Sequence, residues 1–251
     1  MNINEPIKAK DRIILALDVD TLEDVAKYVD LLKDYVGFFK VGLPLFTSCG
    51  FAAVNLIKEH GGKVYFDGKF QDIPDTIAKT SINIMKRGID FFSISATGGS
   101  KMMVNTLNAC INYAKKNEVE PPIILAVTLL SSFGQKTLTN ELGVEMNISD
   151  YVLKLARNAN EAGLSGVVAP DTDAGKIKRE LGENFIVVCP AVRPTWAIVN
   201  DQIRIVSPSD AIKAGADYMI IGRPITMAHD PVAAAKLIIA EIEEALKMNE
   251  E

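Results

Sequence analysis

Short apolar runs rich in β-branched residues alternate with amphipathic segments along nearly the whole chain. Strands favour β-branched residues and helices repeat apolar positions every three or four residues, so the pattern predicts eight strands, each followed by a helical segment. The expected strands cover residues 12–18, 37–42, 63–67, 90–96, 123–127, 164–169, 184–189 and 217–221. The expected helices cover residues 21–32, 44–59, 72–87, 100–116, 148–162, 171–181, 208–215 and 231–248. Residues 128–147 and 190–207 are expected to form longer irregular connections.

Strands that alternate with helices predict a parallel sheet. Eight such repeats within 251 residues favour an α/β fold of the closed (β/α)8, or TIM-barrel, type. We expect a single catalytic domain over residues 1–251, with residues 1–10 as an N-terminal extension. The alternative is an open doubly wound sheet, but the Gly-x-Gly-x-x-Gly turn that often follows its first strand is absent.

Composition narrows the possible partners. A net charge of −5 argues against non-specific nucleic-acid binding, which needs a basic face. The start of the chain lacks a signal-peptide pattern, and no uninterrupted apolar run is long enough to span a bilayer, so no membrane partner is expected. Three widely spaced cysteines are typical of reduced thiols in a cytoplasmic protein. With two histidines in the chain, neither a histidine-based metal site nor a Ser-His-Asp triad is expected.

The stretch from Tyr65 to Pro74 holds the most concentrated candidate chemistry. Asp67 and Lys69 come at the end of an apolar run, and side chains alternate along a strand with period 2, so both are expected on one side. Asp72 follows at the start of the next helix. Charges this dense at a strand end indicate either a structural ion pair or a catalytic group.

Polar residues also follow several other expected strands. Asp18 ends the first strand, and Lys40 interrupts the apolar second strand, so that Lys40 must be paired or point into the barrel mouth. The loops after strands 7 and 8 of such barrels often bind phosphate. Gly222 lets backbone N–H groups approach an anion and Arg223 offers a cationic fork, over which Gln202 and Arg193 could close. The residues thus predict a small phosphorylated ligand.

Together, the Asp67-x-Lys69-x-x-Asp72-Ile73-Pro74 signature, Asp18, Lys40 and the Gly222-Arg223 pair resemble orotidine 5'-phosphate decarboxylases. The resemblance runs from the first strand to the last helix. Sugar-phosphate relatives share the Asp-x-Lys-x-x-Asp signature but use magnesium and carry an acidic residue where this chain has Lys40. Lys40, Ile73-Pro74, Ser131 and the Pro190-x-x-Arg193 loop therefore favour the nucleotide enzyme.

The resemblance implies a decarboxylation of orotidine 5'-phosphate to uridine 5'-phosphate without cofactor or metal, in a homodimer with shared active sites. It implies that Lys69 protonates C6 of the pyrimidine, that Asp67 lies beside the substrate carboxylate, and that Lys40 and Asp72 complete a charge network. Asp72 would reach the partner subunit's site. The implied substrate contacts are Asp18 and Lys40 at the ribose, Thr76 across the dimer, Ser131 at the pyrimidine edge, Gln202, Gly222 and Arg223 at the phosphate, and Arg193 in the closing loop.

Four positions depart from the family pattern. Gly68 stands in place of a leucine-like residue and is expected to loosen the strand end, whereas Gln71 and Ser95 stand where histidine is common. Ala191 replaces a glycine and predicts a different loop backbone, because alanine tolerates positive φ poorly. Two alternatives stay open: a magnesium-dependent sugar-phosphate decarboxylase or aldolase on the same barrel, and a non-catalytic nucleotide-phosphate-binding barrel.

Overall fold

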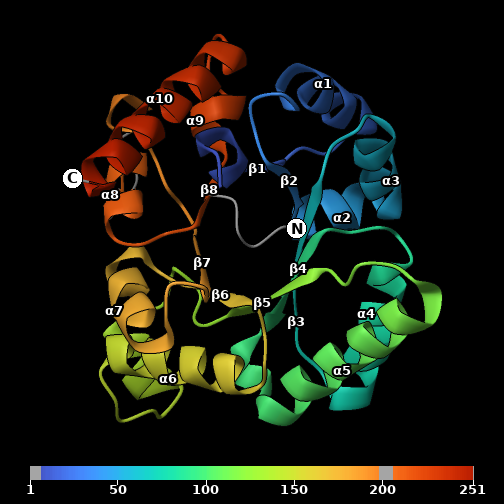
Figure 1. Ribbon diagram of the computed structural model, residues 1–251, viewed down its shortest axis with the longest axis vertical. Helices are drawn as coiled ribbons and strands as arrows, with labels where there is room; N and C mark the ends of the chain where they lie inside the picture. Colours follow the sequence, from blue (N-terminus) through green and yellow to red (C-terminus); the bar gives the residue numbers. More distant parts are fainter. Residues whose placement is uncertain (1–6, 198–205, 251) are drawn as a thin grey trace. The chain divides into compact units, whose positions relative to one another are not determined.

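The computed structural model describes residues 7–197 and 206–250 and shows eight parallel strands in a closed barrel, ordered β1 to β8 as in the sequence (Figure 1). The predicted (β/α)8 fold is therefore confirmed. The strands are β1 (Ile13–Ala16), β2 (Phe38–Val41), β3 (Val64–Phe70), β4 (Phe91–Ser95), β5 (Ile123–Val127), β6 (Gly166–Val168), β7 (Ile186–Cys189) and β8 (Tyr218–Ile221). The α-helices are α1 (Leu22–Leu32), α2 (Leu43–Cys49), α3 (Phe51–Glu59), α4 (Pro74–Met85), α5 (Ser100–Asn117), α6 (Ile148–Glu161), α7 (Asp171–Leu181), α8 (Pro208–Lys213), α9 (Arg223–Thr226) and α10 (Pro231–Glu250). Short turns of 3-10 helix are η1 (Ala9–Arg12), η2 (Ala96–Gly98) and η4 (Thr195–Ala197), and η3 (Thr137–Glu141) is a π-helical turn.

The chain divides into two compact units, one of residues 1–65 and 189–251 and one of residues 66–188. In the first unit β1 pairs with β2 on one side and with β8 on the other, with Leu15 opposite Phe39 and Ile221. The rings of Phe38 and Tyr218 meet edge to face at 5.8 Å in its core. Helices α8 and α10 pack side by side in this unit (Figure 1).

In the second unit β4, β5, β6 and β7 pair in sequence order, with Ile94 opposite Ala126 and Val127 opposite Val168. The strands are almost wholly buried, as expected of a parallel sheet. Helices α4 and α5 pack against each other, and this is the most extensive helix contact of the unit (Figure 1). The buried side chains of α5 include Met102, Met103 and Cys110.

Local features at two helix starts explain where the helices begin. Thr21 caps α1 by accepting a hydrogen bond from the backbone N–H of Asp24 at 3.1 Å, and its hydroxyl donates to the Asp24 carboxylate at 2.7 Å. Pro74 occupies the first turn of α4, where the missing N–H costs nothing. These caps fix where the helices after β1 and β3 begin.

Several element boundaries differ from the sequence prediction. The single helix expected over residues 44–59 is two helices, because Gly50 has a φ of +58° and interrupts the hydrogen-bond ladder between α2 and α3. β3 does not end at Asp67 but continues to Phe70. Residues 9 and 10, expected in the N-terminal extension, lie in η1, where the side chain of Ala9 is buried. The single-domain assignment stays a prediction.

Among the described residues, no helix combines the length and apolar character needed to cross a membrane.

Candidate active site

The C-terminal half of β3 carries a closely packed group of polar atoms. Nζ of Lys69 lies 2.6 Å from Oδ2 of Asp67, and the Asp67 side chain is 9% exposed. The other carboxylate oxygen, Oδ1, accepts a hydrogen bond from the hydroxyl of Ser93 on β4 at 2.8 Å. Asp67 therefore bonds two side chains at once, and its charge is held in one orientation.

The backbone of Lys69 is unusual for a residue inside a strand. Its φ is +48°, in the left-handed region that costs an L-residue roughly 1–2 kcal/mol. Its N–H donates to Oγ of Ser93 at 3.0 Å. Strained backbone of this kind persists where the surroundings hold it, and such positions gather at functional sites.

Gly68 lies between Asp67 and Lys69, and the ring of Phe70 packs closely over it. A Cβ atom at Gly68 would lie 2.5–2.9 Å from three ring carbons of Phe70. The Phe70 ring also contacts the Phe66 ring, at a centroid distance of 5.5 Å. β3 continues through Gly68, and the Phe70 ring fills the space above it; that Gly68 loosens the strand end stays a prediction.

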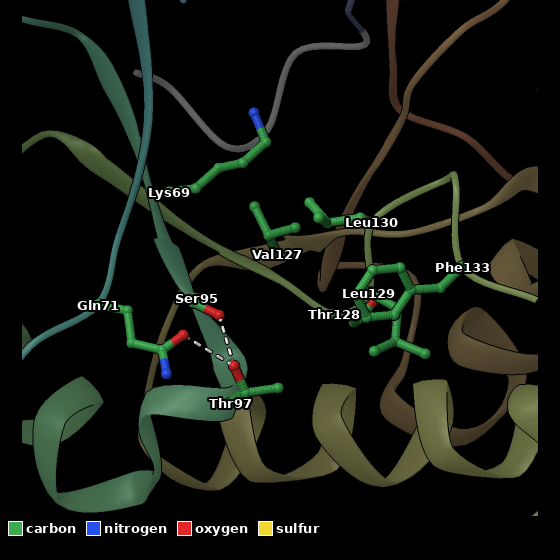
Figure 2. Close-up of a pocket in the computed structure, with 9 residues that line it drawn as sticks. All are labelled: Lys69, Gln71, Ser95, Thr97, Val127, Thr128, Leu129, Leu130 and Phe133. Carbon is green, nitrogen blue, oxygen red and sulfur yellow. Dashed lines mark hydrogen bonds between the residues drawn. The ribbon is translucent and has the colours of Figure 1, made fainter. Parts of the chain in front are cut away.

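A pocket of about 290 Å³ adjoins Lys69, and all of its lining lies within the second unit (Figure 2). One side is apolar, formed by Val127, Leu129, Leu130 and Phe133. The other side holds a chain of hydrogen bonds in which Thr97 donates to Oε1 of Gln71 at 2.9 Å and lies 2.8 Å from the Ser95 hydroxyl. The pocket thus offers an ammonium group, hydrogen-bonding groups and an apolar wall to one small ligand.

The start of α4 is exposed beside this site. The carboxylate of Asp72 accepts a hydrogen bond from the N–H of Ile73 at 2.6 Å. Ile73 is 67% exposed, and Asp72 and Thr76 are exposed as well. Ser131 is exposed on the turn that follows β5, where the N–H of Phe133 bonds the carbonyl of Leu130.

In the first unit the predicted residues Lys40 and Asp18 lie together. Nζ of Lys40 is 3.3 Å from Oδ1 of Asp18, and the Lys40 side chain is 10% exposed. A Cβ atom at Gly42 would lie 2.7 Å from this ammonium group, so glycine at position 42 provides the space that the ammonium occupies. Of the two expectations for Lys40, that it is paired or that it points into the barrel mouth, the structure confirms that it is paired.

The segments after β7 and β8 hold the residues expected at a phosphate. Arg193 is buried, and its N–H bonds the carbonyl of Val206 at 2.8 Å. Gly222 caps α9, and Arg223 is exposed in its first turn. Ala191 has a φ of +60°, so the expectation that alanine avoids a left-handed backbone here is wrong. Gln202 lies outside the described residues.

The sequence analysis missed three residues at these sites. Ser93, Thr97 and Gly42 each contact a predicted site residue or its neighbour, as described above. The position of Ser93, two residues before Ser95 on the same strand, was the available signal, because alternate residues share a face. Thr97 bonds Gln71, 26 residues earlier in the chain, and the role of Gly42 depends on where the Lys40 side chain lies, and the sequence alone shows neither.

A closed (β/α)8 barrel with a lysine–aspartate pair at the C-terminal end of a strand, next to a pocket, belongs to the class of barrel enzymes that act at that face. Residues 11–238 match the family described as Orotidine 5'-phosphate decarboxylase / HUMPS family. The chain therefore belongs to this family, and the resemblance found in the sequence is confirmed.

Individual relatives cover nearly the full length. The chain is 43% identical over 241 residues to orotidine 5'-phosphate decarboxylase of Syntrophotalea carbinolica, covering 96% of this chain and 98% of the relative. It is 45% identical over 239 residues to the Syntrophomonas wolfei protein of the same name, covering 95% of this chain and 100% of the relative. The crystal structure of orotidine 5'-phosphate decarboxylase from Lactobacillus acidophilus matches with a TM-score of 0.81 at 32% identity, covering 92% of this chain and 98% of that one.

Proposed function

We propose that this chain decarboxylates orotidine 5'-phosphate to uridine 5'-phosphate. The observation that carries the proposal is the pairing of Lys69 with Asp67 at 2.6 Å beside a pocket, in a chain of this family. The pocket volume of about 290 Å³ is near the lower end of small-ligand pockets, roughly 300–1,000 Å³, and suits one planar ring.

The chemistry is assigned to Lys69. The bond between C6 and the carboxylate carbon breaks, its electron pair stays on C6, and carbon dioxide leaves. The ammonium of Lys69 stabilises this developing negative charge and then gives its proton to C6, so that one proton is consumed per turnover. The proton on Lys69 is restored from water.

Asp67 has two roles in this proposal. Its carboxylate orients the Lys69 ammonium, and it faces the substrate carboxylate as a like charge that is relieved when carbon dioxide leaves. Lys40 and Asp72 are proposed as the other members of the charge network. No cofactor or metal takes part in the proposed reaction.

The remaining substrate contacts are proposed from the family resemblance. Asp18 and Lys40, which are 3.3 Å apart, bind the ribose hydroxyls. Ser131 binds the pyrimidine edge. The phosphate is bound by Gln202, Gly222 and Arg223, and Arg193 belongs to the segment that closes. Binding energy from the phosphate, far from the reacting carbon, organises the charged groups.

The assay that tests the proposal follows the loss of orotidine absorbance with purified protein, with and without a chelator. We expect equal turnover in both. Turnover that a chelator abolishes would favour the magnesium-dependent sugar-phosphate alternative, and binding of uridine 5'-phosphate without turnover would indicate a binding protein.

A homodimer with shared sites is part of the proposal, supported by the exposure of Asp72, Ile73 and Thr76 at the start of α4. Mixing Lys69→Ala with Asp72→Ala subunits tests it. If Asp72 acts in the partner's site, each mixed dimer contains one intact site, and random exchange recovers about a quarter of wild-type activity. No recovery after verified subunit exchange would place Asp72 in its own subunit's site.

A cytoplasmic location is also proposed, from the three widely spaced cysteines of the sequence. Fractionation of cells that express the protein would test it.

A further inference from the structure

Ser93 is a fully buried hydroxyl in the middle of β4, between Phe92 and Ile94. Burying a hydroxyl without a hydrogen-bond partner is costly, so its contacts explain why the strand tolerates it. Ser93 donates to Oδ1 of Asp67 at 2.8 Å and accepts from the backbone N–H of Lys69 at 3.0 Å.

These two bonds close a ring of interactions. The Lys69 ammonium bonds one oxygen of Asp67, the Ser93 hydroxyl bonds the other, and the Lys69 backbone bonds the Ser93 hydroxyl in turn. Ser93 is therefore joined to the same lysine and aspartate that are assigned to the chemistry. Its contact with Lys69 is to the backbone N–H, whereas the Lys69 ammonium bonds Asp67.

Two of the other buried hydroxyls of the second unit bond within their own helices. Ser81 on α4 donates to the carbonyl of Ala78, three residues earlier, and Thr106 on α5 donates to the carbonyl of Met102. Such local bonds satisfy a hydroxyl within its own helix. The partners of Ser93 lie 24 and 26 residues away along the chain, on the neighbouring functional strand.

The strained backbone of Lys69 indicates what the hydrogen bond to Ser93 does. With φ at +48°, the residue requires surroundings that hold it. The bond from its N–H to Ser93 is such a restraint, and the ion pair with Asp67 is a second one. Loss of the first would let the backbone relax toward ordinary strand geometry and would move the ammonium group.

We propose that Ser93 is a positioning residue for the reaction, which holds the Lys69 backbone and the Asp67 carboxylate so that the ammonium stays directed at the reacting carbon. This inference rests on the proposed function. Ser93 acts through Lys69 and Asp67 and does not touch the substrate. A misplacement of about 1 Å in such a group can lower the rate roughly 100-fold.

The kinetic test compares Ser93→Ala, Ser93→Thr and the control Ser81→Ala, in which an equally buried serine is lost. We expect Ser93→Ala to lower kcat roughly 10- to 100-fold, with KM changed less than about threefold. Ser93→Thr keeps the hydroxyl and should recover kcat to within about fivefold of wild type. Ser81→Ala should keep kcat and KM. Equal kinetics in Ser93→Ala and Ser81→Ala would overturn the inference.

A second readout does not depend on turnover. Amide hydrogen exchange at Lys69, followed by NMR, should be at least about tenfold faster in Ser93→Ala than in wild type, while Tyr65 and Phe66 exchange as before. If Ser93→Ala folds poorly, Ser93→Cys, with its weak donor and acceptor, takes its place in both measurements.

Turnover and amide exchange together distinguish a failure of the proposed function from a failure of the role given to Ser93. A wild-type protein that leaves orotidine 5'-phosphate unchanged refutes the proposed function, and the exchange measurement still decides whether Ser93 holds Lys69. Unchanged exchange at Lys69 overturns the inference, as does faster exchange with unchanged kcat in an active enzyme.

Discussion

Lys69 and Asp67 bond each other across Gly68, with Nζ of the lysine 2.6 Å from Oδ2 of the aspartate on the same strand. Residues two apart on a strand share a face, and the backbone of Lys69 has in addition a left-handed conformation. The pair is both the structural ion pair and the catalytic candidate that the sequence left as alternatives.

Replacing Lys69 by alanine should abolish turnover but spare binding. Loss of the general acid and of its charge is expected to lower kcat by at least about 10³-fold. Uridine 5'-phosphate should still bind within about tenfold of wild type, because its phosphate and ribose contacts are elsewhere. Steady-state kinetics and calorimetry measure the two effects, and Lys79→Ala, on an exposed position of α4, is the matched control. Wild-type kcat in Lys69→Ala would refute the mechanism.

Arg223→Ala should act mainly on affinity. Hydrogen bonds to a charged group contribute about 1.5–3 kcal/mol, so KM is expected to rise roughly 10- to 100-fold. Arg179→Ala removes an exposed arginine from α7 and should change neither KM nor kcat. A fall in kcat at unchanged KM would contradict a phosphate role for Arg223.

Gly68→Ala should destabilise the protein because its Cβ would lie 2.5–2.9 Å from the Phe70 ring. Overpacking of this kind costs about 1–3 kcal/mol in the free energy of unfolding. The clash involves one side chain, so Phe70→Leu in the same chain should recover part of the loss. Denaturant unfolding of the two single variants and the double variant gives the coupling, and additive effects would show that the ring is not the obstacle.

Ala191→Gly should stabilise the fold by up to about 1 kcal/mol, since relief of roughly 1–2 kcal/mol of strain exceeds the entropy that glycine adds to the unfolded chain. Ala214→Gly is the control: Ala214 has a φ of −74°, and glycine there should only destabilise. Both are measured by denaturant unfolding. Destabilisation by Ala191→Gly would contradict strain at this position.

Alkaline pH should destabilise the protein through Tyr218. Burial raises the pKa of Tyr218 to about 12 from an ordinary value of 10.0, so the folded state holds the phenolic proton more tightly. The stability that this proton contributes is complete below pH 10 and is lost as pH rises toward 12, a change of about 3 kcal/mol. Tyr218→Phe should have a weaker pH dependence of unfolding free energy over this interval. Identical slopes for the two proteins would remove Tyr218 as the cause.

The sequence predicted the repeating architecture because alternation of buried strands and amphipathic helices is a local property. It failed at Gly50, where the apolar positions of α2 and α3 continue one helical pattern and only the backbone shows the break. It also ended β3 too early, because the strand pattern of apolar residues stops at Phe66 whereas the backbone pairing does not.

The charged site residues were found from the sequence because a charge in or after an apolar strand is costly and therefore conspicuous. Ser93 was missed because a serine inside a strand carries no such signal, and its importance comes from two bonds to residues more than twenty positions away. The backbone of Ala191 was predicted wrongly because intrinsic preference opposes positive φ, and the surrounding structure overrides that preference.

Filling of the space above Gly68 by the Phe70 ring makes positions 68 and 70 a coupled pair in the course of sequence divergence. A side chain can be gained at position 68 only after, or together with, a change that moves or shortens the ring. In an alignment of close relatives, the two positions should therefore covary, and glycine at 68 should accompany an aromatic residue at 70. The spacing between Asp67 and Lys69 would then be preserved while the residues at positions 68 and 70 change.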